Sequence, residues 1–356
     1  MTPAARIVLD GRDITANLIP APFGLPLEGG GSVLTRGFLS GGPLLGLTVT
    51  DNEGIKSDAA ELRLDNRRQI PAPKKGAKMQ IWLGYAETGL VYMGNYEVES
   101  WTKSGRPRTL LVSAKAAGLT TEIKSPKSRS YHDKTVGEIV EQIAGKNGLT
   151  SIVHPTLKSF KIGHIDQSTE SDINFLTRLA KRVGGNFKVA DRRLIMNLAG
   201  SGSLPSGGAA PVFPCYEIGE SDWTATGSER GSYKSASAAW QNTETGERES
   251  VVKGSGTPRF RDRKLYKTQE EAERAAEAQL SALTRGKVSF SDTRPGWPEI
   301  FAGARLDVID HDPDVDGLFN LKTVAHSIDS AGYKTSLTAE SVGSEGGSEG
   351  SGGSDE

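Results

Sequence analysis

Apolar and polar residues alternate over long stretches of this chain, and this alternation constrains its fold more than any other feature. Leucine or valine takes every second position at 45–49, and apolar residues alternate in the same way at 62–64 and 79–85. Because successive side chains of a strand point to opposite faces, a period of two predicts strands with one buried face. Further strands are expected at about 90–100 and 109–114.

Composition points to many turns and excludes several classes of function. Glycine supplies 43 of the 356 residues, well above the usual share of about 7%, which favours a β-rich chain with many turns. The formal net charge of -1 argues against a strongly basic nucleic-acid binder. Cys215 is the only cysteine, so a disulfide framework and a multi-thiolate metal site are excluded, and a reducing cytoplasm is expected. Neither a signal peptide nor an apolar run of membrane-spanning length is present.

The pattern changes from strand to helix near the middle of the chain. A capping box at Thr135 and Glu138 begins one helix, which carries apolar residues at helical spacing and ends at Gly148. A second apolar-periodic helix spans about 173–183 and is followed by two short strands. Residues 125–199 are therefore predicted to form a compact α+β unit.

The remaining segments are divided by composition and pattern. The helix expected after residue 254 follows a capping box at Thr268 and Glu271, and strands return from 287 to 340. The tail holds 6 Gly, 4 Ser and 4 acidic residues, which bury no apolar area. The predicted divisions are an extended Pro- and Gly-rich N-terminal arm at 1–43, a first β domain at 44–124, the α+β middle domain at 125–199, a linker at 200–211, a second β domain with one helix at 212–342, and a disordered tail at 343–356.

Two stretches, 76–111 and 303–337, resemble each other. Each begins with Gly-Ala and a basic residue, continues as an alternating strand, and turns at a glycine followed by two apolar residues. Each turns again at Gly105 or Gly332 before a last strand. Two unrelated β meanders are the alternative, since glycine turns between strands are common. A true repeat predicts two related β domains, and repeated units often build rings.

Several stretches together resemble the phage late control protein D family, the baseplate hub of contractile tails. The resemblance covers about 40–340 and is most specific at 167–180, which reads QSTESDINFLTRLA. The order and spacing of the stretches carry the match, since none is a catalytic signature. The stretches are 47–67, 71–85, 91–100, 128–149, 164–185, 192–200 and 321–340.

The resemblance implies an α+β, mainly β fold, with two tube-type antiparallel β-barrel-like domains flanking a smaller α+β domain. It implies a homotrimer whose six β domains surround a channel and join a threefold central spike protein to the sixfold tail tube protein. Other baseplate proteins and tape-measure proteins are further expected partners. The implied location is the tail baseplate of a phage or phage-like particle, after synthesis in the host cytoplasm. Because the strand pattern stops near residue 340, the spike is expected to be a separate polypeptide.

One acidic turn resembles a metal site. Asp312, Asp314 and Asp316 precede Gly317 with the spacing that begins a calcium loop. Position 12 of that loop is Thr323 where the bidentate glutamate belongs, and no helices are expected around it. We therefore favour a solvated turn between strands.

The remaining candidate residues have structural explanations. Cys215 has no adjacent histidine, so a packed thiol is favoured over a nucleophile. Glu170 and Asp172 stand at a helix start, where the helix dipole accounts for acidic groups, and Ser171 is a candidate cap. No catalytic, cofactor-binding or metal residue is predicted, and no cofactor. Five histidines lack the spacing of a metal or catalytic pair: His132, His154, His164, His311 and His326.

One basic run, TPRFRDRKLYK at 257–267, interleaves five cations with Phe260 and Tyr266. Such interleaving can bind single-stranded nucleic acid, and an assembly contact with an acidic partner is the alternative. The nearly neutral chain favours the assembly contact. DNA passing through a channel needs weak contact, so the run is expected to lie off the lumen.

Two other classes of function stay open from the sequence. A tail-associated cell-wall hydrolase would need a carboxylate pair or a metal in a cleft. A cell-wall-binding module would use the α+β middle domain to grip peptidoglycan.

Overall fold

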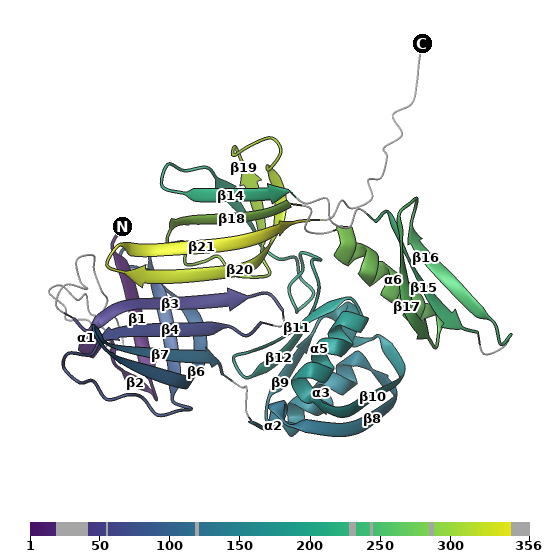
Figure 1. The fold of residues 1–356 in the computed structure, drawn as a ribbon, viewed down its shortest axis with the longest axis horizontal. Helices are drawn as coiled ribbons and strands as arrows, with labels where there is room; N and C mark the ends of the chain where they lie inside the picture. The colour runs from purple at the N-terminus through teal and green to yellow at the C-terminus, as the bar shows by residue number, and fades with distance from the viewer. Residues whose placement is uncertain are drawn as a thin grey trace, which may run out of the picture.

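The computed structural model describes residues 1–18, 42–54, 56–117, 121–227, 233–242, 245–284 and 288–342. Four separate hydrophobic cores divide these residues into four units, which Figure 1 shows side by side. We name them the first β unit, the middle unit, the side unit and the second β unit. The tail predicted at 343–356 lies outside the described residues, as does 19–41 of the predicted arm. No helix among the described residues is both long enough and apolar enough to cross a membrane.

The first β unit is a run of antiparallel strands whose inward residues form one core. Ile81 and Leu83 of its central region are fully buried, as are Leu44 and Leu110 on neighbouring strands. The alternation seen in the sequence therefore marks its buried face. Its elements are β1 (Pro3–Leu9), β2 (Arg12–Asp13), α1 (Thr15–Leu18), β3 (Leu44–Asn52), β4 (Ala59–Asp65), β5 (Lys78–Tyr85), β6 (Gly89–Gly105) and β7 (Arg108–Ala116).

The extended arm predicted at 1–43 is wrong for its first 18 residues. Strand β1 pairs antiparallel with β5, from Pro3 opposite Tyr85 to Leu9 opposite Met79. Ile7 of this strand is fully buried. The short run of β-branched and apolar residues at 7–9 was the signal for this strand, and the Pro- and Gly-rich segment that follows obscured it.

The second β unit has its own core and continues the same sheet. The sheet holds 13 strands among the described residues, and β20 of this unit pairs directly with β3 of the first. The two β units therefore share one mainly antiparallel sheet that passes through two cores. The elements are β13 (Val212–Tyr216), β14 (Asp222–Gly227), β18 (Val288–Pro295), β19 (Arg305–Ile309), β20 (Gly317–Asp329) and β21 (Gly332–Ser341).

The middle unit is the predicted compact α+β unit. Thr135 caps helix α3 and forms the predicted capping box with Glu138. The apolar faces of α3 and α5 bury Ile139, Ile143 and Leu176 completely. Its elements are α2 (Thr121–Lys124), β8 (Pro126–Thr135), α3 (Val136–Lys146), β9 (Thr150–Val153), α4 (Pro155–Lys158), β10 (Lys161–Ser171), α5 (Asp172–Arg182), β11 (Gly185–Ala190) and β12 (Arg193–Leu198).

The helix expected inside the second β domain packs elsewhere. It lies against a separate three-stranded sheet, and together they form the side unit on the right of Figure 1. Ala272 and Ala276 face this sheet and are fully buried. Their small side chains let the helix approach the strands closely. The elements are β15 (Ser235–Gln241), β16 (Arg248–Gly254), β17 (Arg259–Tyr266) and α6 (Gln269–Thr284).

The segment predicted as a linker at 200–211 follows a defined path. Ser203 and Ala209 form an isolated antiparallel bridge, and Leu204 donates a backbone hydrogen bond to Gly208. The Asn197 side chain donates to the Ser203 carbonyl at 2.7 Å. The segment connects the middle unit to β13 as a closed turn held against the middle unit.

Candidate assembly surface

The two similar stretches, 76–111 and 303–337, fold as two β-meanders that make the same hydrogen bonds. In the first, Val98 donates to Ala77 at 2.9 Å and accepts from Gly76 at 2.8 Å. The second meander repeats both bonds at 3.0 and 2.8 Å. A β-bulge follows directly in each central strand, after Val98 in β6 and at the matching place in β20. The residues of the second meander that make these bonds are Gly303, Ala304 and Leu321.

The correspondence extends to the strands around each meander. The first β unit runs in the order β3-β4-β7-β6-β5-β1, and the second runs β14-β18-β21-β20-β19-β13. Following the registers across the sheet makes Val98 equivalent to Leu321, Val112 to Leu337, and Val49 to Ala225. The match breaks at one edge, where β1 is antiparallel to β5 but β13 is parallel to β19.

One contact between the two units is a strand pairing inside the chain. The part of β20 beyond its bulge pairs with β3, from Thr323 opposite Asn52 to Asp329 opposite Gly46. This part of β20 has already left its neighbour β19, whose register ends at Asn320. Beyond its bulge, one edge of β20 therefore has no partner strand within the second β unit. We call this unpaired half of a strand edge a half-edge, and β3 of the first unit occupies it.

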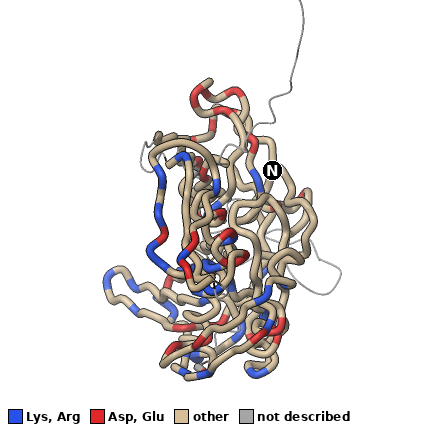
Figure 2. Tube along the Cα trace, turned by 90° about the vertical axis from the view of Figure 1, so that its right-hand side faces the viewer, with Lys and Arg blue, Asp and Glu red and all other residues tan. Residues whose placement is uncertain are grey.

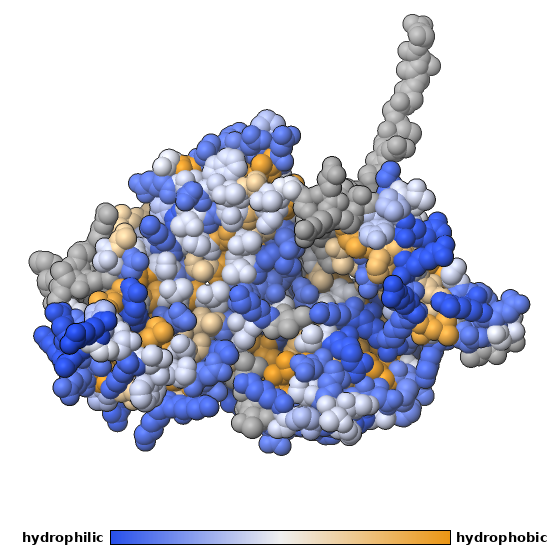
Figure 3. Space-filling model, viewed as in Figure 1, coloured by the Kyte–Doolittle hydropathy of each residue, from blue (hydrophilic) through white to orange (hydrophobic). Residues whose placement is uncertain are grey.

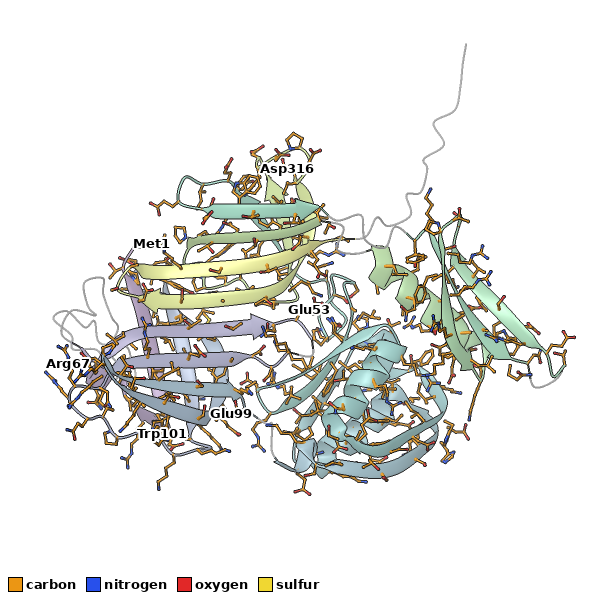
Figure 4. All side chains as sticks on the ribbon, viewed as in Figure 1. Met1, Glu53, Arg67, Glu99, Trp101 and Asp316 are labelled. Carbon is orange, nitrogen blue, oxygen red and sulfur yellow. The ribbon has the colours of Figure 1, made fainter. Side chains whose placement is uncertain are left out.

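The equivalent half-edge of the first unit has no neighbouring strand among the described residues. Beyond its contact with Ala77, β6 continues from Glu99 to Gly105 with β7 on one side and no described strand on the other. Within the described part of the chain, strand β14 likewise pairs only with β18. Figure 1 shows these two edges at opposite ends of the sheet, and Figure 4 shows Glu99 and Trp101 at the lower one. Open strand edges are places where another chain can pair.

The face of the sheet away from the cores is rich in hydroxyl groups. Between β14 and β7 the side chains that point away from the cores are mainly serine and threonine, interspersed with charged residues of both signs such as Glu61, Arg63 and Lys115. The hydroxyl residues of this face are Thr224, Thr226, Ser289, Ser291, Thr293, Ser336, Thr338, Ser327, Thr48, Thr50, Thr109 and Ser113. Such a face is polar without being strongly charged.

A buried ion cluster joins the middle unit to both β units. Lys188 of β11 donates to Asp51 at 2.5 Å and lies 2.9 Å from Asp58. The other carboxylate oxygen of Asp51 accepts from the backbone of Ala302 in the second β unit at 2.8 Å. Nearby, Glu53 accepts from Asn186 at 3.1 Å, at the centre of Figure 4. The cluster fixes the middle unit where the two β units meet.

We expect stability to fall as pH rises from about 4 to about 7 because of this cluster. Burial raises the pKa of Asp58 to about 7 against 3.8 in a free chain, the Asp51 charge acts in the same direction, and Lys188 opposes both. The folded protein therefore binds more protons than the unfolded one between pH 4 and 7. The free energy of unfolding should drop by on the order of 2–4 kcal/mol across that window. Thermal unfolding measured at pH 5 and 7.5 tests this, and Asp58→Asn should flatten the dependence; an unchanged slope in that variant contradicts it.

A second buried ion pair stands where the repeat has leucines. On β18, Arg294 donates to Asp292 at 2.6 Å, and both side chains are nearly inaccessible. The equivalent residues of β4 are Leu62 and Leu64. Arg294 also donates to the Tyr216 carbonyl at 3.2 Å. At equivalent buried positions the second β unit therefore holds an ion pair, and the first β unit holds two leucines.

Asp172 at the start of α5 is a buried hub of the middle unit. It pairs with Lys127 at 2.6 Å and accepts hydrogen bonds from Gln167 at 2.9 Å and Asn147 at 3.1 Å. Burial alone raises the pKa of this carboxyl, but these donors outweigh burial and hold the pKa below its usual value. Asp172 therefore makes an ion pair and hydrogen bonds in addition to the predicted interaction with the helix dipole. Ser171 caps the helix by accepting from the Asn174 backbone at 3.2 Å.

The structure brings together two histidines that sequence spacing kept apart. His132 on β8 lies opposite His164 on β10, with their Nδ1 atoms 3.0 Å apart. His164 also contacts Asp166 at 2.9 Å through Nε2. Strand pairing over 32 residues creates this contact, so no local motif could have revealed it. Among the described residues no group of three or more His, Cys, Asp or Glu side chains is arranged to hold a metal.

His326 and Cys215 are both core residues. His326 lies within 3.1 Å of Thr335 and 3.0 Å of the Tyr333 hydroxyl, and burial lowers its pKa. Cys215 is fully buried on β13, and burial raises the pKa of its thiol to about 11. The imidazole is therefore neutral and the thiol protonated at neutral pH.

The acidic turn at 312–317 is closed by its own hydrogen bonds. Asp316 accepts from the backbone amides of Asp310, His311 and Asp312 at 3.0 to 3.2 Å. These amides lower the pKa of Asp316. A carboxylate that caps three amides accounts for the turn without a metal.

The basic run forms an edge strand of the side unit. Most of it is β17, which pairs only with β15 among the described strands, and Arg261 and Arg263 are exposed. Figure 2 looks onto this side of the molecule and shows an edge along which Lys and Arg predominate. Figure 3 shows hydrophobic residues in small, separated patches among hydrophilic ones.

One cleft of about 870 Å³ opens between the start of the chain and the second β unit. Tyr85, Trp297 and Tyr333 line it together with the carboxylates of Asp222 and Glu299. No histidine or cysteine is among its described lining residues. The cleft therefore combines aromatic surface with carboxylates.

Several solved structures share this fold. The tail protein from Neisseria meningitidis MC58 matches with a TM-score of 0.66 at 13% identity, over 96% of this chain and 97% of that one. The 43 kDa tail protein of prophage MuSo2 from Shewanella oneidensis matches with a TM-score of 0.65 at 13% identity, over 95% and 98%. An E. coli type VI secretion component, c3393, matches with a TM-score of 0.53 at 12% identity, over 83% and 73%. At these identities the likeness concerns the fold.

Sequence comparison is more specific. The probable baseplate hub protein of Escherichia phage P2 is 27% identical over 383 residues, covering 96% of this chain and 93% of that protein. The probable baseplate hub protein of Escherichia phage 186 is 27% identical with the same coverage. The family model described as phage tail baseplate hub (GPD) matches residues 101–332, well over half of the chain. The duplicated β units with open edges are thus those of a protein that belongs to the phage tail baseplate hub family.

Proposed function

We propose that this chain is the structural hub of a contractile tail baseplate, in a phage or a phage-like particle. Three copies form a ring that joins a threefold central spike to the sixfold tail tube. The observation that carries this proposal is the duplication: two β units with equivalent strands lie in one sheet, so three chains supply six similar positions. Its action is geometric, and no covalent step is part of the proposal.

The hydroxyl-rich face of the sheet is the proposed channel lining. Serine and threonine present polar, uncharged groups, so a passing polyanion meets neither strong attraction nor strong repulsion. Many Lys and Arg contacts would release counterions and hold the nucleic acid in place. The first β unit, the middle unit and the second β unit correspond in this proposal to a first ring position, an outward brace and a second ring position.

The partners follow from this geometry. The spike and the tail tube bind the two ends of the ring, and other baseplate proteins with the tape-measure protein complete the assembly. The protein is located in the tail baseplate after synthesis in the host cytoplasm.

The oligomeric mass tests the ring. A trimer of the 37.9 kDa chain has a mass of about 114 kDa, measured by light scattering after size exclusion. A dimer or tetramer contradicts threefold geometry. If the isolated protein is a monomer, the same measurement on protein co-expressed with its spike or tube decides, and a monomer there also contradicts the ring.

Reversing the charges of the basic run should impair assembly. Arg261→Glu with Arg263→Glu places negative charge on an exposed strand of the side unit, away from the shared sheet. We expect particle yield to fall several-fold while the isolated protein stays folded, because an acidic partner would be repelled. Lysine at both positions is the matched control. Unchanged yield with glutamate would remove the run from the assembly contacts.

A cell-wall hydrolase or wall-binding module is the second candidate function. The carboxylates in the cleft beside Trp297 are the observation that favours testing it. Clearing of a turbid cell-wall suspension by the purified protein would support hydrolysis. Co-sedimentation with purified sacculi would support binding by the middle unit.

A further inference from the structure

We propose that His132 and His164 of the middle unit bind one divalent transition-metal ion of the Zn²⁺, Ni²⁺ or Cu²⁺ class, with water completing the coordination. The two residues lie on β8 and β10 and are directly opposite each other in the register of these strands. Their ring centroids are 4.4 Å apart, and their Nδ1 atoms are 3.0 Å apart. The site lies outside both β units and does not depend on the proposed ring.

The contact between His164 and Asp166 determines which ring nitrogen of His164 can bind a metal. Nε2 of His164 lies 2.9 Å from a carboxylate oxygen of Asp166. An ionised carboxylate only accepts hydrogen bonds, so the hydrogen of the neutral ring is on Nε2. Nδ1 of His164 is then left with a lone pair, and a neutral imidazole nitrogen with a lone pair is the form that binds metals.

The distance between the two Nδ1 atoms is close to that in a metal site. Zinc binds histidine nitrogen at about 2.0–2.1 Å, so two nitrogens on one tetrahedral ion are about 3.4 Å apart. From the observed 3.0 Å, the two rings need to separate by only a few tenths of an ångström. Two lone pairs at 3.0 Å repel each other unless a hydrogen or a cation lies between them. A hydrogen on Nδ1 of His132 is the alternative, and titration with a metal separates the two.

Asp166 holds His164 in place without being a ligand itself. Its second carboxylate oxygen accepts a hydrogen bond from the Ser130 hydroxyl at 2.6 Å, so two contacts fix the carboxylate. A histidine that binds a metal usually donates its other N–H to a carboxylate or a carbonyl, which sets the orientation of the ring. Asp166 is therefore a positioning residue, which agrees with the absence of a three-ligand group among the described residues.

The two rings form an accessible pair. His132 is exposed, and 29% of the His164 side chain is accessible, so water can complete the coordination of a bound ion. By contrast, His154 and His326 are buried, and their ring nitrogens take part in hydrogen bonds inside the protein. A metal ion added to the protein therefore meets two accessible imidazoles together at this place.

The cations near this pair have partners of their own. Arg178 donates to the Asp166 carbonyl at 2.7 Å, but its charge is paired with Glu170 at 2.7 Å. On β8, Lys134 donates to Gln142 at 3.0 Å. The carboxylates of Asp166 and Glu170 therefore balance these cations, and a metal ion meets no unpaired positive charge on either side chain.

A bound ion would join two strands that are distant in the sequence. Strands β8 and β10 form a two-stranded sheet and are each other's only strand partners among the described residues. The two histidines are 32 residues apart and come together only in the folded chain. An ion that binds both nitrogens therefore stabilises the folded middle unit, because the unfolded chain offers no such pair.

Calorimetric titration of the full, tag-free chain with Zn²⁺ tests the site. We expect one ion per chain, with the dissociation constant raised at least about tenfold in His132→Gln and in His164→Gln, because each variant loses one ligand nitrogen. His311→Gln, which removes an imidazole of the second β unit, is the matched control and should bind as the parent chain does. Absence of Zn²⁺ binding, or equal binding by the two glutamine variants and the parent, overturns the proposal.

Cu²⁺ gives a direct count of the ligands. The nitrogen couplings in its electron paramagnetic resonance spectrum should show two imidazoles in the parent chain and one in each single variant. Asp166→Asn should weaken binding by about tenfold while both imidazoles stay coordinated, as expected for a positioning residue. A spectrum with the same imidazole count in the parent and in His132→Gln overturns the shared site.

Hydrogen exchange locates the bound ion in the fold. Saturating Zn²⁺ should slow amide exchange in β8 and β10 of the parent chain and leave it unchanged in the double variant His132→Gln with His164→Gln. Protection that persists in the double variant places the ion elsewhere and overturns the proposal. The measurement on the parent chain alone also decides, since binding without protection of these two strands contradicts an ion that joins them.

Discussion

Arg294→Leu is expected to lower the free energy of unfolding by about 3–5 kcal/mol. The substitution leaves the Asp292 carboxylate, whose side chain is inaccessible, without its cation inside the second core. It also removes the hydrogen bond to the Tyr216 carbonyl. Denaturant unfolding followed by the fluorescence of Trp223 and Trp297, both in this unit, measures the loss.

The repeat itself supplies the control for this prediction. Adding Asp292→Leu to Arg294→Leu recreates the leucine pair that the first β unit carries at 62 and 64. Because two apolar side chains need no compensating charge, the double variant should recover most of the lost stability. A double variant as unstable as the single one would show that packing, rather than the unpaired carboxylate, sets the cost.

Asp172→Ala should destabilise the middle unit by about 3–5 kcal/mol. Lys127, Gln167 and Asn147 all direct donors at this carboxylate, and the substitution leaves them without it. Because the pKa of Asp172 is below its usual value, its contribution is present above about pH 4 and is lost as the pH falls through its folded pKa. Hydrogen exchange of the α3 and α5 amides, followed by mass spectrometry, reports this unit separately from the shared sheet.

Asp166→Ala is the matched control for Asp172→Ala. Asp166 lies on the neighbouring strand β10 and accepts from Ser130 at 2.6 Å, but it is exposed to solvent. Its removal should cost far less stability than the removal of Asp172, because solvent screens the interactions of an exposed carboxylate. Equal losses from both variants would contradict the special position of Asp172.

Local pattern predicted the elements of this protein well where one residue period governs a segment. The capping box of Thr135 and Glu138 marks the start of α3, and the alternation at 79–85 marks β5. Strand β1 was missed because a Pro- and Gly-rich segment follows it, although its short run of β-branched and apolar residues is present in the sequence. The helix beginning at Gln269 was predicted correctly but assigned to the wrong core. Its alanine stripe indicates that one face of the helix is buried, but it does not indicate which sheet that face packs against.

The chemistry of the buried groups was less accessible from the sequence. Asp172 was interpreted through the helix dipole, because two of its partners, Asn147 and Lys127, lie 25 and 45 residues away in the chain. Lys188 and Asp51 are separated by 137 residues and meet through the packing of the middle unit on the first β unit. Pairs of this kind depend on how the units pack against each other, and that packing produces no periodic pattern in the sequence.

The sequence by itself determined which faces are buried and where helices begin, because these properties follow from residue period and turn chemistry within a few neighbours. It indicated a repeat of two meanders but left two unrelated meanders open. The tertiary structure alone decided that the two meanders lie in one sheet, that β3 occupies one half-edge, and that Trp101 stands exposed beside the other. Strand pairing over hundreds of residues depends on register and backbone position. Neither is encoded by a local pattern, since any alternating strand can pair with any other.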